Sequence, residues 1–182
     1  MIEDVMIALA LSAVIGLASH TSTPGWLDNK VAGYVMDGGS EDSNIGVYDK
    51  RSGFFMIRDF ECDGAIKSIL LTRDRKLVAD QGFYVPGFSP NDRRGYSKLI
   101  EKPLRSLETG KGVKIGDSQA DVRRRLGFPT EAKHTGARKQ FVDYEYRLHV
   151  GKGDDAEVDE QRYTFKANKL IQIDFEHGSG RE

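Results

Sequence analysis

The chain has 182 residues, of which 38% are hydrophobic and 30% charged, and its formal net charge is −1. This length fits one medium domain or two small ones, and the near-neutral charge argues against nucleic acid as the main partner. The single cysteine, Cys62, cannot form a disulfide within the chain. The sequence contains no Cys/His cluster at zinc spacing and no phosphate-binding loop, so neither a metal site nor a cofactor is expected.

The N-terminal segment is apolar. Residues 5–18 carry no charge and are shorter than the roughly 20 residues that span a bilayer. They resemble the core of a secretory signal, although Glu3 and Asp4 precede them where basic residues are expected. We therefore predict that residues 1–18 direct export, to the periplasm or the medium; an uncleaved membrane anchor and a buried helix are the alternatives. Residues 19–30, rich in Ser, Thr, Pro and Gly, are expected to be a linker.

Residues 31–108 are expected to form a β-rich region. Short apolar runs predict strands at 45–48 and 66–71, and mixed alternation from Phe54 predicts a third strand between them. An Asp-Gly pair before the last of these strands is typical of a hairpin turn. A helix interrupted by proline is expected within residues 92–108.

Residues 109–177 are expected to form a second unit, followed by a tail at 178–182. In this unit Ser118 is predicted to cap a short helix at 118–126, which Gly127 ends. Because a helix of this length is unstable alone, its apolar residues must pack on a sheet. The sheet strands are predicted at 140–149, 161–167 and 170–176. The expected fold class is α+β, with short helices packed on an antiparallel sheet and two β-rich halves.

Two segments of the sequence resemble each other. Residues 60–69 and 165–175 both run from an aromatic residue through a two-residue turn into a β-branched strand. Two unrelated hairpins would give the same pattern, and this interpretation is favoured over an internal duplication.

The C-terminal unit resembles the SmpA/OmlA-like domain, which is shared by small outer-membrane assembly lipoproteins and β-lactamase inhibitory proteins. The resemblance covers residues 112–176. It rests on Ile115, Gly116, Ser118, Val122, Leu126, Gly127, Pro129, Tyr146 and Phe165. The chain lacks the lipid-attachment cysteine of the lipoproteins and the disulfide pairs of the inhibitory proteins. The resemblance therefore implies an exported interaction domain that binds through variable surface residues and carries no catalytic set.

Two surfaces are candidates for binding. Phe83, Tyr84 and Phe88 lie in a proline-bounded loop, where exposed aromatic residues often anchor interfaces; the alternative is that they plug the end of the sheet. Arg123 and Arg124 belong to a basic stretch of the predicted helix, for which simple solvation is the favoured interpretation.

The function expected from these patterns is that of an exported, non-enzymatic module that binds an envelope protein. Membrane association through residues 5–18 would follow if that segment is not cleaved. The alternatives are a structural envelope protein and an enzyme with an unrecognised site around the acids Asp59, Glu61 and Asp63.

Overall fold

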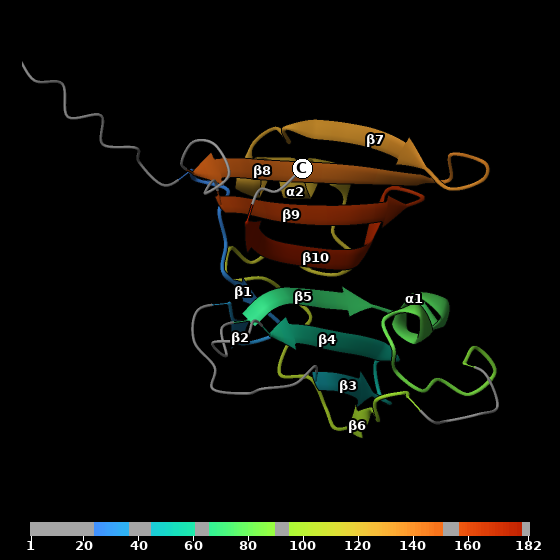
Figure 1. Cartoon of the computed structure of the whole chain (residues 1–182). Coiled ribbons are helices and arrows are strands. Elements are labelled where there is room, and N and C mark those ends of the chain that lie inside the picture. Colours follow the sequence, from blue (N-terminus) through green and yellow to red (C-terminus); the bar gives the residue numbers. More distant parts are fainter. Residues whose placement is uncertain (1–23, 37–44, 61–65, 90–94, 151–156, 180–182) are drawn as a thin grey trace, which may run out of the picture.

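The computed structural model describes residues 24–36, 45–60, 66–89, 95–150 and 157–179 (Figure 1). The predicted signal segment, residues 19–23 of the predicted linker and residues 180–182 of the predicted tail lie outside these ranges. The two helices of the described part are α1 (Arg75–Asp80) and α2 (Gln119–Leu126). Its strands are β1 (Lys30–Val31), β2 (Tyr34–Val35), β3 (Ile45–Asp49), β4 (Phe54–Phe60), β5 (Ile66–Thr72), β6 (Ile100–Glu101), β7 (Glu131–Thr135), β8 (Phe141–Val150), β9 (Glu157–Lys166) and β10 (Lys169–Ser179).

Eight of these strands form one sheet in the order β6-β3-β4-β5-β10-β9-β8-β7, and β1 and β2 form a small second sheet. Neighbouring strands of the large sheet are antiparallel except β3 and β6, which are parallel. The fold is therefore mostly β, and the expected α+β class is corrected, because the helices are only two and short. The expected short helices and antiparallel pairing are present, but the sheet is mixed, because β3 and β6 pair in parallel.

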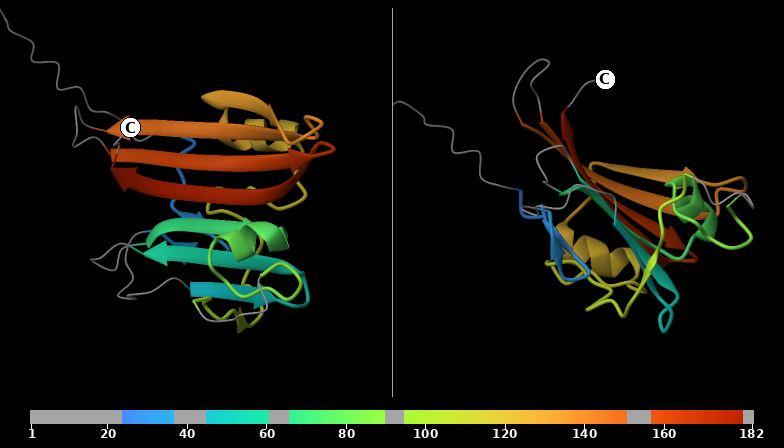
Figure 2. Two further views of the ribbon diagram at one scale, coloured as in Figure 1. Left: turned by 45° about the vertical axis from the view of Figure 1, so that its right-hand side comes forward. Right: turned by 60° about the horizontal axis from the view of Figure 1, so that its bottom comes forward.

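The two helices lie on opposite sides of the sheet (Figure 2). We call the side that carries α2 and β1–β2 the inner face, and the side that carries α1 the outer face. The inner face is apolar along its whole width, because alternate residues of every long strand join one buried cluster. Its largest members include Phe54, Met56, Leu71, Tyr146, Tyr163, Phe165, Ile173 and Phe175, and α2 adds Val122 and Leu126.

Helix α2 begins and ends as its sequence predicts. The Ser118 hydroxyl accepts a hydrogen bond from the amide of Asp121 at 3.2 Å, and the Asp121 carboxylate accepts one from the Ser118 amide at 3.1 Å. This reciprocal capping satisfies two amides that would otherwise lack partners. Gly127 ends the helix with a φ of 87°, which other residues rarely adopt. Val122 is fully buried and Leu126 6% exposed, so the helix docks as expected.

Several sequence expectations in the first part of the chain are corrected. No helix occurs between residues 95 and 108, where only the two-residue strand β6 interrupts the loop. Helix α1 was not predicted, although Asp74 caps it by accepting hydrogen bonds from the amides of Lys76 and Leu77. Strand β7 was also missed, because its sequence has no apolar alternation.

The sheet consists of two similar meanders, β3-β4-β5 and β8-β9-β10, that meet where β5 pairs with β10. Leu71 lies opposite Ile173, and Ile69 lies opposite Phe175. A two-fold rotation about the point midway between these pairs exchanges β5 with β10. The two similar segments of the sequence belong to hairpins β4–β5 and β9–β10, which thus occupy corresponding places, as a duplicated unit would. Residues 61–65, which include Cys62 and the expected Asp-Gly turn, lie outside the described part.

Candidate functional site

An aromatic pocket of about 570 Å³ opens on the outer face of the first meander. Its floor is the pair Tyr48 and Phe55, whose rings stack with centroids 4.6 Å apart. These residues lie opposite each other on β3 and β4, so the strand pairing itself sets the stack. The walls come from α1 and from the loops on either side of residues 90–94: Arg75, Tyr84, Val85, Pro86, Tyr96 and Lys98.

The three predicted aromatic anchors have different environments. Tyr84 is half-buried and lines the pocket, and Phe88 is 51% exposed. The expectation that Phe83 is exposed is wrong: its side chain is 0% exposed and packs against Ile57, Leu70 and other residues of the outer-face cluster. Phe83 thus fills the space between its loop and the outer face of the sheet.

Close packing explains why Phe83 is buried there. Gly46 of β3 leaves room for its ring, because a Cβ added at that glycine would lie only 2.5 Å from Phe83 Cε1. Ser89 then holds the loop: its hydroxyl donates to the Phe83 carbonyl at 3.1 Å and accepts from the Val85 amide at 2.8 Å. The loop is therefore fixed in a shape that leaves Tyr84 at the pocket wall.

Charged groups surround the mouth of the aromatic pocket. The guanidinium of Arg75 lies 5.5 Å from the Phe88 ring centroid, so it joins the exposed phenyl ring to the pocket wall. Lys98 adds a second exposed cation. Glu101 adds an acid, which Lys50 approaches at 3.6 Å. The pocket can therefore hold an apolar side chain with a carboxylate beside it.

Sequence reasoning found only Tyr84 of the four aromatic residues in this pocket. Tyr48, Phe55 and Tyr96 were missed because they come from three separate segments of the chain. The hydrophobic pattern predicted strands near Tyr48 and Phe55 but gave no signal for which face either side chain occupies. Which face is the outer one depends on where α1 packs, and α1 was not predicted from the sequence.

Arg123 and Arg124 lie on α2, on the other side of the sheet from the aromatic pocket, so the two predicted surfaces do not form one site. Arg124 forms an ion pair with Asp121. The guanidinium of Arg123 lies 5.9 Å from the ring centroids of both Phe128 and Tyr144. Phe128 is 84% exposed. The positive charges of Arg123 and Arg124 are thus partly balanced by contacts in and next to α2 itself.

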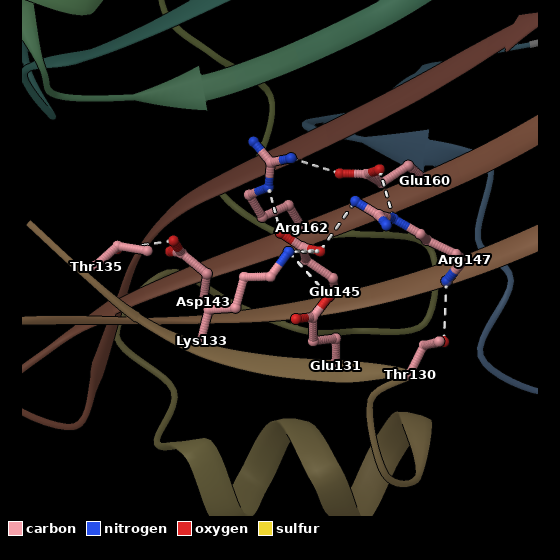
Figure 3. A network of polar contacts seen from close by, with 9 residues as sticks. All are labelled: Thr130, Glu131, Lys133, Thr135, Asp143, Glu145, Arg147, Glu160 and Arg162. Atoms are coloured by element: carbon pink, nitrogen blue, oxygen red, sulfur yellow. Dashed lines mark hydrogen bonds and ion pairs between the residues drawn. The ribbon is translucent and has the colours of Figure 1, made fainter. Parts of the chain in front are cut away.

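A second surface, not predicted from the sequence, lies on the outer face of β7–β9. Glu145 is only 4% exposed and forms ion pairs with three cations (Figure 3). Its carboxylate lies 3.1 Å from both Lys133 Nζ and Arg147 Nη2, and 3.4 Å from Arg162 Nε. Glu160 lies 2.8 Å from Arg147 Nε and 2.5 Å from Arg162 Nη2. We call these five residues the charged network. Glu131, 2.9 Å from Lys133 Nζ, adds a third acid, so that three acids face the three cations. This balance is the condition for burying Glu145 at low cost.

Asp174 extends the charged network to β10. Burial raises the pKa of Asp174 to about 6. The nearby Arg162 lowers this pKa, but only in part, because the charges of Glu176 and Glu160 raise it further. Burial alone would lower the pKa of Arg162, but Glu160, Asp174 and Glu145 outweigh it and hold that pKa above its ordinary value. Arg162 therefore remains charged at the centre of this face, whereas Asp174 changes charge near pH 6.

A second pocket, of about 820 Å³, lies at the end of β9 and β10 beside β1. His177 Nδ1 lies 2.7 Å from Asp159 Oδ1 at its wall, and Lys30 and Lys111 contribute cations. Among the described residues, those that line this pocket include no Ser, Thr or Cys.

The acids proposed for an enzyme site are only partly placed. Asp59 accepts a hydrogen bond from the Phe60 amide at 2.9 Å, whereas Glu61 and Asp63 lie outside the described residues. Within the described ranges, no three His, Cys, Asp or Glu side chains are grouped so that they could hold a metal ion. None of the helices in those ranges is long and apolar enough to cross a membrane.

No protein-family model matches the chain, and neither the curated proteins nor the solved structures compared with it give a significant match. Its function must therefore be inferred from its own residues.

Proposed function

We propose that this chain is an exported, non-enzymatic module that binds a protein of the cell envelope through the aromatic pocket. The observation that carries this proposal is the convergence of Tyr48, Phe55, Tyr84 and Tyr96 on one pocket beside the exposed Phe88. Aromatic side chains are enriched among the residues that dominate binding energy at interfaces. A pocket with this lining takes an apolar or aromatic side chain of the partner.

The partner's side chain would carry an acidic neighbour. Arg75 and Lys98 stand at the pocket mouth, and Arg75 can form a bidentate contact with a carboxylate. Glu101 lies at the same mouth and would repel a second carboxylate placed next to it. The proposed ligand is therefore one aromatic or aliphatic anchor flanked by a single Asp or Glu.

Export and kinship belong to the same proposal. The apolar segment 5–18 supports export. The resemblance of residues 112–176 to the SmpA/OmlA-like domain supports an envelope role. Helix α2, capped at Ser118 and packed on β8–β10, is consistent with that resemblance. Cell fractionation followed by N-terminal sequencing tests export. A chain recovered only from the cytosol with Met1 retained would contradict it.

A crosslinking pull-down from an envelope extract tests the binding proposal. The bait is the wild type, the double variant Tyr84→Ser/Phe88→Ser, or the control Phe128→Ser. Phe128 is the matched control because it is an exposed aromatic residue on the other side of the sheet. We expect one protein to be recovered with the wild type and with Phe128→Ser, and lost with the double variant.

Two results would contradict the pocket as the binding site. One is recovery of no specific protein by the wild type. The other is loss of the partner with Phe128→Ser and not with the double variant, which would assign binding to the α2 surface instead. Circular dichroism of each variant shows whether a loss reflects unfolding, and Phe88→Ser alone serves if the double variant unfolds, because Phe88 is half exposed.

A further inference from the structure

A polar groove of about 540 Å³ lies at the junction of the two meanders, beside the start of α1. Thr72, Asp143, Arg162, Thr164 and Gln172 line it. It is separate from the aromatic pocket, with which it shares no lining residue.

Strand pairing places four of these side chains in one row across the sheet. Gln172 lies opposite Thr164, and Thr164 lies opposite Asp143. Thr72 Oγ1 donates to Gln172 Oε1 at 3.0 Å and so continues the row onto β5. Neighbouring strands are about 4.8 Å apart, so Gln172, Thr164 and Asp143 place hydrogen-bonding groups at a regular spacing over three strands. Thr72 is 2% exposed and fixes the Gln172 amide at the end of the row.

The row contains one polar atom that the protein does not satisfy. Asp143 is 9% exposed, and its Oδ2 accepts from Thr135 Oγ1 at 2.8 Å, but its Oδ1 is buried without a hydrogen-bond partner. Arg162, which lines the groove from the neighbouring row, makes no hydrogen bond through Nε but forms an ion pair with Glu145 there at 3.4 Å. A buried atom such as Asp143 Oδ1 costs about 1–3 kcal/mol when left unpaired, so it indicates a missing donor.

Charges of both signs line the groove, from Arg73, Arg162 and Lys169 and from Asp74 and Asp143, so neither an anion nor a cation meets charges of one sign only. The guanidinium of Arg162 is neutralised by Glu160 and Glu145. Arg73, at the rim, donates to the Ser52 carbonyl at 2.7 Å, and the unpaired Asp143 would repel an anion. A cation would instead meet Arg162.

We infer that this groove binds a neutral polyhydroxylated ligand, an oligosaccharide, through the row from Thr72 to Asp143. A sugar hydroxyl is both donor and acceptor, so one ring can donate to Asp143 and accept from the Gln172 amide and the Thr164 hydroxyl. Phe141, half-buried at the groove wall, offers apolar surface to the C–H groups of the ring. Lys166 Nζ lies 5.7 Å from the centroid of the Phe141 ring.

Calorimetric titration of the full chain with neutral hexasaccharides tests this inference. The probes are cellohexaose, maltohexaose and chitohexaose, and a sulfated heparin hexasaccharide is the anionic comparison. The variant is Thr164→Val/Gln172→Ala, which removes two hydrogen-bonding groups. The control is Ser68→Ala, a change on the same face of the sheet outside the groove.

We expect at least one neutral hexasaccharide to bind, with an affinity at least tenfold lower for the double variant and unchanged for Ser68→Ala. Binding of none of the neutral probes, binding of the sulfated probe alone, or equal affinity for the double variant would each overturn the inference. If the double variant unfolds, Thr164→Val alone is used, with at least a threefold loss expected and equal affinity as the contrary result. Tyr84→Ser should leave sugar binding intact, so the two proposals can fail separately.

Discussion

The two meanders share a strand order and differ in what their outer faces carry. One row of directly opposed residues crosses both: Gly46, Ile57 and Leu70 in the first meander, then Asp174, Arg162 and Glu145 in the second. The two-fold rotation exchanges Leu70 with Asp174 and Ile57 with Arg162. Positions that correspond in the backbone are thus apolar on one side of the axis and charged on the other.

The difference shows that the backbone pairing does not decide which face of a sheet is covered. Leu70 and Ile57 require a cover, and α1 supplies it with Val78 and Ala79. In the second meander the corresponding side chains neutralise one another, so this face needs no helix. The inner faces, in contrast, are apolar in both meanders and hold them together in one core.

The largest expected effect tests the inner face of the second meander. Val122→Asp places an unpaired charge at a fully buried position and should lower the free energy of unfolding by about 3–5 kcal/mol. Arg124→Asp, at an exposed position of the same helix, should cost less than about 1 kcal/mol. Urea denaturation measures both. Equal midpoints would contradict the packing of α2.

The next effect compares the two outer faces directly. Ile57→Lys buries a cation in the apolar cluster under α1, where Ile57 is 4% exposed, and should cost about 3 kcal/mol. Thr164→Lys, on the uncovered outer face of β9, should change stability by less than about 0.5 kcal/mol. Thermal denaturation of the two variants gives the difference. A similar loss in both would show that the second outer face is also packed.

A smaller, pH-dependent effect is expected at Asp174. Because its pKa is raised to about 6 from 3.8, the fold prefers the protonated acid, and this stabilisation is present below about pH 4 and lost as the pH rises through 6. Asp174→Asn should therefore be more stable than the wild type at pH 8, by at most about 3 kcal/mol, and show no such gain at pH 3.5. Denaturation at both pH values checks the sign. A variant less stable than the wild type at pH 8 would show that Asp174 favours folding as a charged partner of Arg162.

The smallest effect concerns the exposed ion pair of α1. Lys76 Nζ lies 2.6 Å from Asp80 Oδ2, and both side chains are more than half exposed. Lys76→Ala should change the free energy of unfolding by no more than about 0.5 kcal/mol. Asp74→Ala, which removes the cap of the same helix, should cost about 1 kcal/mol. A larger loss of stability for Lys76→Ala than for Asp74→Ala would contradict the interpretation that the Asp74 cap sets the start of α1.

The sequence by itself determined the local elements that carry strong signals. Ser118, Asp121 and Gly127 specify where α2 begins and ends, because capping depends on residues within one turn. Alternation and turn residues likewise located most strands of both meanders to within a few residues. The sequence also predicted Tyr84 and Phe88 as surface residues of one loop.

Only the tertiary structure decided the rest. The burial of Phe83, the aromatic pocket and the row from Thr72 to Asp143 each join residues from segments far apart in the chain. Periodicity shows that a strand has two different sides, but which side meets a helix depends on where that helix packs. Strand β7 and helix α1 were missed for the same reason: each is short, and contacts beyond the element hold it in place.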